Sequence, residues 1–350
     1  MKIAVFLPNW IGDVVMATPA LRAIREKFED AEIVGVMRPY VADVLTGTNL
    51  INRHLFHNPR GHNREQKGWN FAKTLRAEKF DMSILFPNSL RSAWWAWMSR
   101  AKTRVGFRRD RRGWLLTDLL FPKSKRHPHP VIDDYLRIAQ YLGCRNLSRK
   151  MVLATLPEDE QALKKFRENH PAISTDRGYV CLNPGGAYGS AKHWPNESFA
   201  ELALRVVDEL KKDVLILCGP DEIDSARAIT HIANRPNVVS FAEAPPSIGL
   251  TKAAIRHADL LVTTDSGPRH FAAAFQVPEI TLFGPTHIAW SNTFFDKAVH
   301  LQLDMECGPC QQRICPLKHH RCMRDLSVQQ VFDTVTASLK KYSAPLKKAS

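Results

Sequence analysis

Polar residues that can bind an anion follow two short apolar runs late in the sequence. Leu260–Thr264 and Ile280–Phe283 are rich in β-branched residues, as is typical of strands buried on both faces. A polar turn containing glycine follows each run. Because parallel strands end at one edge of a sheet, where ligands bind, we predict that the two turns form one ligand site. Its predicted residues are Asp265, Ser266, Gly267, His270, Gly284 and Thr286.

The sequence after the first run predicts a helix that begins beside this ligand. Ser266 suits a helix cap, Pro268 suits the first helical position, and Val277 and Pro278 end the pattern. A helix start offers free N–H groups and a partial positive charge, which favour a phosphate or diphosphate. His270, one turn into the helix, can donate to a phosphate oxygen. The alternative is an ordinary strand, turn and helix with a capping serine and a surface histidine.

An acidic residue near the start of the chain is a candidate general base. Lys2–Phe6 is predicted to be a strand and Ala20–Phe28 an amphipathic helix, with a glycine turn at residues 8–13 between them. This is the opening of a doubly wound α/β domain, so Asp13 also falls at a carboxyl edge. A carboxylate in an interdomain cleft can take a proton from a substrate. The alternative is that Asp13 only stabilises a helix start electrostatically.

Arginine-rich turns in the first half predict a site for an anionic acceptor. Gly106–Gly113 is too irregular for a basic amphipathic helix and is predicted to be a loop. Guanidinium groups suit phosphate and carboxylate, although a solvated surface run is the alternative. The turn Pro87–Ser92 follows another predicted strand, Met82–Phe86, and also lies at a carboxyl edge. The predicted acceptor contacts are Asn9, Asn88, Ser89, Arg91, Arg108, Arg109, Arg111 and Arg112.

The second half of the chain repeats the alternation of strands and helices. Tyr179–Leu182 is a predicted strand, and a long glycine-rich loop, Asn183–Pro195, follows it. Lys192 in this loop is a candidate phosphate contact, although the spacing of the glycines is not that of a Walker sequence. Val214–Cys218 is the next predicted strand. Glu222 follows it, where a carboxylate can accept hydrogen bonds from a ribose diol.

These patterns predict an α/β fold with two Rossmann-like, doubly wound domains whose binding turns face a central cleft. At 350 residues the chain is long enough for two such cores. We predict an N-terminal Rossmann-like domain at residues 1–170 and a C-terminal Rossmann-like domain at residues 171–325. Residues 326–350 are predicted to form a helix that packs back across the domains.

The composition limits the partners and the compartment. A formal charge of +14 indicates an anionic partner, a membrane surface, or both. The usual nucleic-acid signatures are missing from the sequence, so we do not expect nucleic acid as a partner. No apolar run is long enough to span a bilayer, and the N-terminus is interpreted as a strand, not a signal peptide. The expected location is the cytoplasm, with peripheral attachment to the inner face of the cytoplasmic membrane.

Four cysteines near the C-terminus have the number of ligands that a structural zinc site needs. Cys307, Cys310, Cys315 and Cys322 are spaced C-x2-C-x4-C-x6-C, which matches no standard zinc finger. Two disulfides are the alternative, disfavoured in a reducing cytoplasm, and free thiols are a third. The spacing does not decide among zinc, disulfides and free thiols.

Six ordered motifs make the chain similar to a known enzyme family. They are PNWIGDVVMATPALRAI, FPNSLRSAW, GFRRDRRGWLLTD, NPGGAYGSAKHWP, TTDSGPRHFAAA and LFGPT. Together they resemble the ADP-heptose:lipopolysaccharide heptosyltransferases of glycosyltransferase family 9, and most of all the heptosyltransferase II branch. The resemblance implies the GT-B fold, with the acceptor bound by the first domain and ADP-heptose by the second. Asp13 matches the position of the proposed catalytic base. The positions that match the donor site are Lys192, Glu222, Asp265, Ser266, Gly267 and His270.

By this resemblance the reaction would invert the anomeric configuration. Heptose would pass from ADP-L-glycero-D-manno-heptose to the heptosyl-Kdo2-lipid A core of lipopolysaccharide, with no cofactor or catalytic metal required. The alternatives are heptosyltransferase I or another family 9 transferase, and a GT-B nucleotide-sugar epimerase, which would need no acceptor loop. A basic RNA- or membrane-binding protein on an inactive scaffold is a further alternative. The complete set Asp13, Lys192, Glu222, Asp265 and His270 argues against it, because an inactive scaffold would not need these residues.

Overall fold

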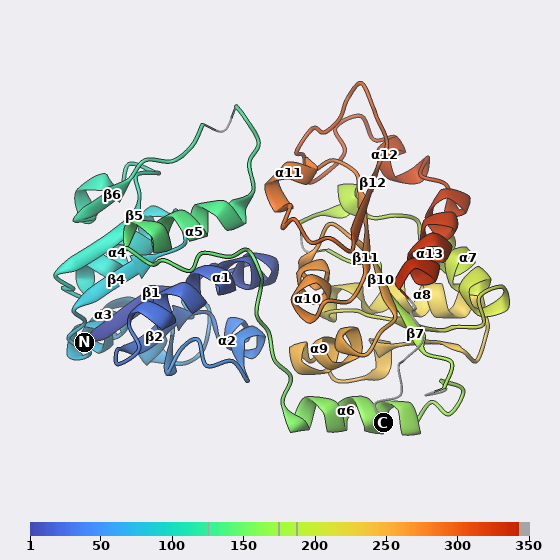
Figure 1. Cartoon of the computed structure of the whole chain (residues 1–350), viewed down its shortest axis with the longest axis horizontal. Helices are drawn as coiled ribbons and strands as arrows, with labels where there is room; N and C mark the ends of the chain where they lie inside the picture. The colour runs from blue at the N-terminus through green and yellow to red at the C-terminus, as the bar shows by residue number, and fades with distance from the viewer. Residues whose placement is uncertain (125, 174–175, 187, 343–350) are drawn as a thin grey trace. The chain divides into compact units, whose positions relative to one another are not determined.

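A computed structural model describes residues 1–124, 126–173, 176–186 and 188–342 of the chain. These residues form two compact units (Figure 1). The first unit contains Met1–Ala154 and Ala289–Thr293, and the second contains Thr155–Ile288 and Phe294–Ser350. Residues 343–350, the end of the predicted C-terminal helix, lie outside the described part. The division after Ala154 is earlier than the predicted boundary at residue 170.

The first unit is built on a six-stranded parallel sheet with the order β3-β2-β1-β4-β5-β6. This is the strand order of a doubly wound nucleotide-binding fold, in which the connections diverge between β1 and β4. Ile3 of β1 lies in register with Ile33 on one side and Met82 on the other. The strands are Lys2–Phe6 (β1), Glu32–Met37 (β2), Arg53–Phe56 (β3), Met82–Leu85 (β4), Thr103–Phe107 (β5) and Asp118–Leu120 (β6).

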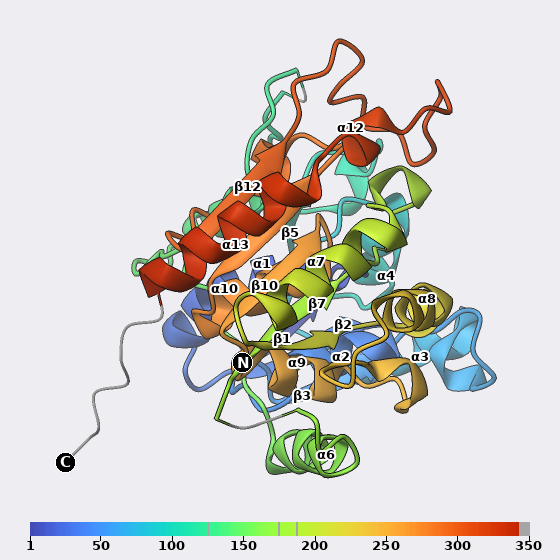
Figure 2. The same ribbon diagram turned by 90° about the vertical axis from the view of Figure 1, so that its right-hand side faces the viewer.

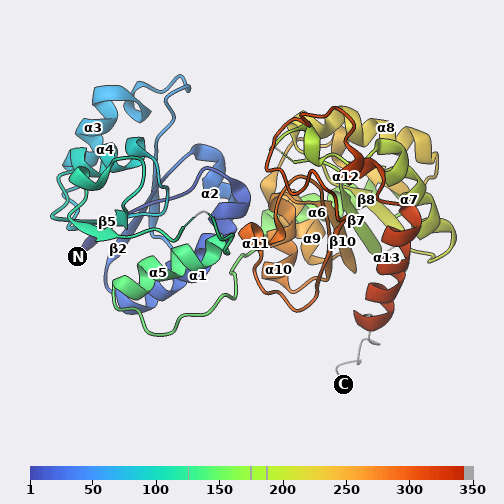
Figure 3. The same cartoon turned by 90° about the horizontal axis from the view of Figure 1, so that it is seen from above.

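In the described part of residues 1–154, α-helices connect or follow these strands. They are Ile11–Lys27 (α1), Pro39–Leu45 (α2), Gly68–Ala77 (α3), Leu90–Met98 (α4) and Val131–Tyr141 (α5). α1 and α5 pack side by side (Figure 3). α1 begins at Ile11, well before the predicted start at Ala20, so Asp13 lies in the first turn of the helix and not in a loop before it.

The early start of α1 depends on how the helix accommodates Pro19. Proline lacks an N–H, so the carbonyl of Val15, four residues earlier, loses its helical partner. The Thr18 hydroxyl donates to this carbonyl at 2.7 Å. The same hydroxyl accepts a hydrogen bond from the Val152 N–H at 2.9 Å, so no polar group is left unsatisfied. The helix therefore continues through a residue that the sequence analysis treated as lying before its start.

The second unit repeats the topology of the first. Its six-stranded parallel sheet has the order β12-β11-β10-β7-β8-β9, so the connections diverge between β7 and β10. The strands are Tyr179–Asn183 (β7), Asp213–Ile216 (β8), Val238–Ser240 (β9), Leu260–Thr264 (β10), Glu279–Phe283 (β11) and Ala298–Gln302 (β12). The predicted strands Leu260–Thr264 and Ile280–Phe283 correspond to β10 and β11, which are neighbours in this sheet.

The helices of the second unit explain where the division of the chain falls. α6 packs on α9, and the Lys252 ammonium lies 3.9 Å from the Asp159 carboxylate, so α6 belongs to this unit. α13 packs against α7 and β10 of the same unit (Figure 2). The helices are Pro157–Glu168 (α6), Asn196–Asp208 (α7), Ile223–Ala233 (α8), Ile248–Arg256 (α9), Gly267–Phe275 (α10), Arg321–Arg324 (α12) and Val328–Tyr342 (α13). A short helix, Ile288–Ser291 (α11), enters the segment grouped with the first unit.

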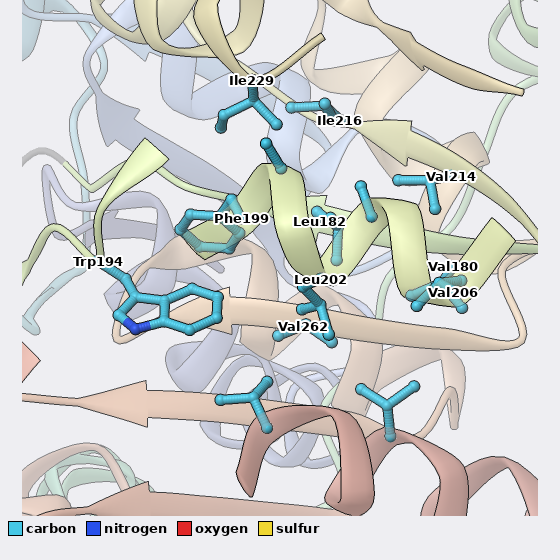
Figure 4. Packing of buried hydrophobic residues seen from close by; sticks show 14 of the residues in the cluster. Val180, Leu182, Trp194, Phe199, Leu202, Val206, Val214, Ile216, Ile229 and Val262 are labelled. Carbon is cyan, nitrogen blue, oxygen red and sulfur yellow. The ribbon is translucent and has the colours of Figure 1, made fainter. Parts of the chain in front are cut away.

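Trp194 links the core of the second unit to its glycine-rich loop (Figure 4). Only 1% of the residue is exposed, and its ring packs edge-on against Phe199 with the centroids 4.9 Å apart. Its indole N–H donates to the carbonyl of Leu326 at 2.9 Å. A buried aromatic residue of this size contributes several kcal/mol to stability, so the loop end at Lys192 is fixed by a strong anchor two residues later.

In the part of the chain that the structure describes, no helix is long and apolar enough to cross a membrane.

Candidate functional site

The predicted donor residues lie where the second sheet changes the direction of its connections. The loop after β7 carries Lys192, and the turn after β10 carries Asp265, Ser266 and Gly267. β7 and β10 are adjacent strands, so their following loops meet at the carboxyl edge. Ligands of doubly wound sheets bind at this point, and the structure therefore brings together two stretches that are distant in the sequence.

A buried ion pair joins these two stretches. The Lys192 ammonium donates to the carboxylate of Asp265 at 2.6 Å and to its backbone carbonyl at 2.9 Å. Lys192 is only 6% exposed, so the pair is held largely away from water. Charges in such surroundings attract strongly but persist only when their remaining hydrogen-bonding groups are also satisfied.

Two further donors surround the Asp265 carboxylate. The Thr286 hydroxyl donates to it at 2.7 Å, and the Arg269 guanidinium approaches it at 3.5 Å. Burial alone would raise the pKa of Asp265, but Lys192 and Arg269 hold it well below its usual range. Asp265 is therefore ionised near neutral pH, where its carboxylate pairs with the two cations beside it.

Arg269 extends the ion pair into a buried network that the sequence analysis did not find. It is 1% exposed and donates to Nε2 of His300 at 2.8 Å, which requires that nitrogen to carry no proton. It also contacts the carboxylate of Glu279 at 3.4 Å. Burial would raise the pKa of Glu279, but Arg269 lowers it. Carboxylates and cations thus alternate from Glu279 through Arg269 and Asp265 to Lys192.

His270 is buried in the same region and is not the surface histidine of the alternative interpretation. It is 4% exposed, and burial, with the charge of Arg269, lowers its pKa to about 3. The imidazole is therefore neutral near pH 7, and it can contribute to a phosphate contact only as a neutral N–H donor.

Hydrogen bonds fix the backbone around the predicted phosphate site. The Asn183 amide donates to the Gly185 carbonyl at 3.2 Å and to the Ser266 hydroxyl at 2.9 Å. The Thr264 hydroxyl also donates to the Gly185 carbonyl, at 2.6 Å. Ser266 is the cap residue of α10, as predicted, but its side chain makes no capping hydrogen bond. Its hydroxyl instead helps to join the two loops.

Glu222 and Gly284 have structural contacts that the sequence did not reveal. The Glu222 carboxylate accepts from the Gly219 N–H at 2.7 Å, and its Cγ would lie 2.1 Å from a Cβ at Gly185. A side chain at Gly185 would therefore displace Glu222, the residue predicted to bind the ribose. A Cβ at Gly284 would lie 2.5 Å from the sulfur of Met323, so this glycine is required for packing.

In the first unit, Asp13 is half-buried in the first turn of α1 and contacts a buried tyrosine. The Tyr135 hydroxyl, from α5, donates to the Asp13 carboxylate at 3.4 Å. Burial and the nearby charge of Asp13 raise the pKa of Tyr135 well above its ordinary value. Tyr135 therefore stays protonated and orients the carboxylate, a role that the sequence analysis did not assign.

Arg112 is fully buried, which is not expected of a residue that contacts an acceptor. Its guanidinium donates to the carbonyls of Phe107 and Pro87, at 2.9 and 2.5 Å, and to the Asn88 side chain at 3.2 Å. It also donates to the Ser89 carbonyl and the Ser92 hydroxyl. Burial lowers its pKa to about 10, so it remains charged near neutral pH. The geometry gives Arg112 a positioning role: it holds the turn after β4.

The other predicted acceptor residues lie nearer to the surface. Arg108, Arg111, Arg91, Asn9 and Ser89 are exposed, and Arg109 and Asn88 are half-buried. Asp110 and Arg111 have left-handed backbone conformations, which turn the chain sharply before Arg112. The loop thus presents Arg108 and Arg111 to solvent while it anchors Arg112 inside.

The four C-terminal cysteines are free in the structure. Within residues 1–124, 126–173, 176–186 and 188–342, no group of three or more His, Cys, Asp or Glu side chains is arranged to hold a metal ion. The structure contains no disulfide that joins these thiols.

Comparison with known proteins decides the family. The model of glycosyltransferase family 9 (heptosyltransferase) matches residues 68–321. The chain belongs to this family. It is therefore a glycosyltransferase, and the predicted resemblance is confirmed.

Relatives of this family 9 chain match it along nearly their whole length. It is 30% identical to lipooligosaccharide heptosyltransferase 2 of Campylobacter jejuni subsp. jejuni serotype O:2 over 97% of this chain and 99% of that one. It is 26% identical to lipopolysaccharide heptosyltransferase 2 of Escherichia coli K12 over 97% of this chain and 99% of that one. The structure of E. coli ADP-heptose LPS heptosyltransferase II matches with a TM-score of 0.80 at 23% identity. The match covers 98% of this chain and 100% of that one. This likeness confirms the predicted GT-B fold.

Removing the central cation of the buried network should destabilise the protein strongly. We expect Arg269→Met to lower the free energy of unfolding by about 3–5 kcal/mol, because Glu279 loses its buried partner. The double variant Arg269→Met with Glu279→Gln should recover part of this loss. Urea denaturation measures both effects.

Arg321→Met is the matched control, because its ion pair with Asp325 is exposed. This variant should lower the free energy of unfolding by less than about 1 kcal/mol. A loss for Arg269→Met no larger than the control's would contradict the network.

The low pKa of His270 should make stability depend on pH. The pKa of the native ring is about 3, whereas the ring in the unfolded chain has the ordinary histidine pKa of 6.5. Below pH 6.5, protons therefore stabilise the unfolded chain. Between about pH 7.5 and about pH 5 we expect His270 to account for a loss of about 2 kcal/mol. The variant His270→Gln should lose that much less over the same range in chemical denaturation. Equal losses in the two proteins would show that His270 titrates normally.

Proposed function

We propose that this chain is an inverting heptosyltransferase II. It transfers heptose from ADP-L-glycero-D-manno-heptose to the heptosyl-Kdo2-lipid A inner core of lipopolysaccharide. The observation that carries the proposal is the near full-length similarity to relatives named heptosyltransferase 2, in both Campylobacter and E. coli. The buried cations at the carboxyl edge of the second sheet support a diphosphate donor.

In this proposal the second unit binds the donor. Lys192 and the N-terminus of α10, beginning at Gly267, contact the diphosphate, while His270 donates as a neutral imidazole. Glu222 accepts from the ribose hydroxyls. Asp265 and Thr286 keep the Lys192 ammonium in place. These groups stabilise the negative charge that develops on the leaving ADP, so the chemistry can proceed on side chains and backbone alone.

The first unit supplies the base and the acceptor contacts. Asp13 takes the proton from an acceptor heptose hydroxyl, whose oxygen attacks the anomeric carbon on the face opposite ADP. Tyr135 orients the Asp13 carboxylate for this step. Arg108, Arg109 and Arg111 hold the phosphorylated sugars of the acceptor, and Arg112 positions the turn that carries Asn88 and Ser89.

The acceptor is an anionic lipid, and the proposal therefore includes peripheral contact with the cytoplasmic face of the membrane. The net charge of +14 favours approach to an anionic surface. Exposed arginines in the acceptor loop would contribute to this attraction, which salt should weaken.

The acceptor requirement tests the proposed function directly. Purified protein and ADP-heptose are incubated with Kdo2-lipid A or with its mono-heptosylated form, and the products are resolved by mass spectrometry. We expect transfer only to the heptosylated acceptor. Transfer to Kdo2-lipid A itself would identify the chain as a heptosyltransferase I instead. Donor turnover that needs no acceptor would favour the epimerase.

Replacement of the base tests the mechanism. Asp13→Asn keeps the size of the side chain but cannot accept the proton, so kcat should fall about 10²-fold to 10⁴-fold. The affinity for ADP, measured by calorimetry, should not change, because the donor contacts belong to the other unit. Tyr135→Phe, which removes only the orienting hydroxyl, should have a smaller effect. Turnover of Asp13→Asn within a few-fold of wild type would place the base elsewhere.

A further inference from the structure

The loop between β12 and α12 is attached directly to the glycine-rich donor loop. The Tyr188 hydroxyl donates to the Gln311 carbonyl at 2.6 Å, and the Ala191 N–H donates to the Arg313 carbonyl at 3.1 Å. A Cβ at Gly189 would lie 2.4 Å from that same Arg313 carbonyl, so the approach is possible only for glycine. This C-terminal loop, which the proposed function does not use, therefore forms one side of the donor site.

The close approach places two cations around one aromatic ring. The Lys192 ammonium lies 4.4 Å from the centre of the Tyr188 ring, and the Arg313 guanidinium lies 5.3 Å from it. The two positive groups are thus less than about 10 Å apart. Both distances are within the range in which a cation is attracted by an aromatic ring. Tyr188 therefore holds Arg313 near the residue that is proposed to contact the diphosphate.

The charges already buried at the site leave a need for another cation. Lys192 and Arg269 are matched by the carboxylates of Asp265 and Glu279, so these four charges sum to zero. The diphosphate of a nucleotide sugar brings two negative charges when it binds. When the bond between the sugar and the β-phosphate oxygen breaks, its electron pair stays on that oxygen, and the leaving group gains further negative charge. An arginine can match phosphate oxygens with two parallel hydrogen bonds.

We propose that Arg313 binds the β-phosphate of the nucleotide sugar together with Lys192. The inference rests on the proposed function, because it requires a diphosphate donor at the edge of β7 and β10. Arg313 is exposed, whereas Lys192 is buried, so Arg313 contacts the phosphate from the solvent side of the loop. Binding of the diphosphate also fixes the C-terminal loop against the donor loop.

Nucleotides that differ by one phosphate test this assignment. ADP carries the β-phosphate and AMP does not. Arg313→Ala should weaken ADP binding about tenfold in calorimetry, as expected for the loss of one charge-assisted contact, and AMP binding by less than about twofold. Arg313→Lys should restore part of the ADP affinity. At saturating donor, kcat of Arg313→Ala should also fall, because the leaving group loses a stabilising charge.

Arg321→Ala is the matched control, because it removes one positive charge from the nearby helix α12. Its guanidinium is exposed and bonded to Asp325 at 2.7 Å, so it should leave both nucleotide affinities unchanged. Equal weakening of AMP and ADP by Arg313→Ala would show a structural disturbance of the loop and would overturn the inference. Unchanged ADP binding would also overturn it. If the wild-type protein binds neither nucleotide, the proposed function itself fails, which is a different result.

Discussion

The contact between Lys192 and Asp265 is the interaction on which the proposed donor site depends. It joins the loop after β7 to the turn after β10, and both groups are withdrawn from water. A lone charge in such a place would be too unfavourable to persist. Each additional group in the region satisfies part of this pair: Thr286 donates to the carboxylate, and Arg269 adds a second cation beside it. The protein's own side chains therefore supply the hydrogen bonds that hold this pair, and electrostatic catalysis depends on groups that are positioned in this way.

The parallel sheet makes this pair possible. Residues 192 and 265 are far apart in sequence, but adjacent strands β7 and β10 bring the loops that follow them to one place. Trp194 then fixes the far end of the first loop to the core, and Pro268 and the cap at Ser266 start a helix at the second. Backbone N–H groups and side-chain cations consequently converge on the same point. The fold supplies the convergence, and the turn residues supply the chemistry.

The sequence was informative where a pattern is local. The central strands have continuous apolar runs, and Asp265, Lys192 and Glu222 lie in the turns or loops that follow such runs, so the fold class and these candidate site residues could be predicted. The edge strands β3 and β12 contain charged or polar residues, as edge strands commonly do, and no apolar run marks them. The start of α1 was not predicted: proline disfavours a helix interior, and the Thr18 hydrogen bond that compensates for Pro19 is visible only in three dimensions.

Burial was the property that sequence could not supply for the arginines. Arg108, Arg109, Arg111 and Arg112 form one basic run, yet Arg112 alone is enclosed by carbonyl groups and serves the fold. Arg269 lies in helix α10, whose sequence pattern is ordinary. Its partners Glu279 and His300 come from strands β11 and β12. Which arginine binds substrate and which supports the backbone is set by long-range contacts. A motif alone assigns all of them the same role.

The two units use carboxylates at equivalent edges for different purposes, and their surroundings explain the difference. Asp265 is next to Lys192 and Arg269, which hold its pKa so low that it cannot accept a proton during turnover. Asp13 contacts a neutral phenol from Tyr135, in a half-buried position at the start of a helix. A carboxylate surrounded by cations is a poor base, because the cations favour its ionised form. The repeated topology thus supplies two similar positions, and the neighbouring side chains make one of them an anchor for cations and the other a candidate base.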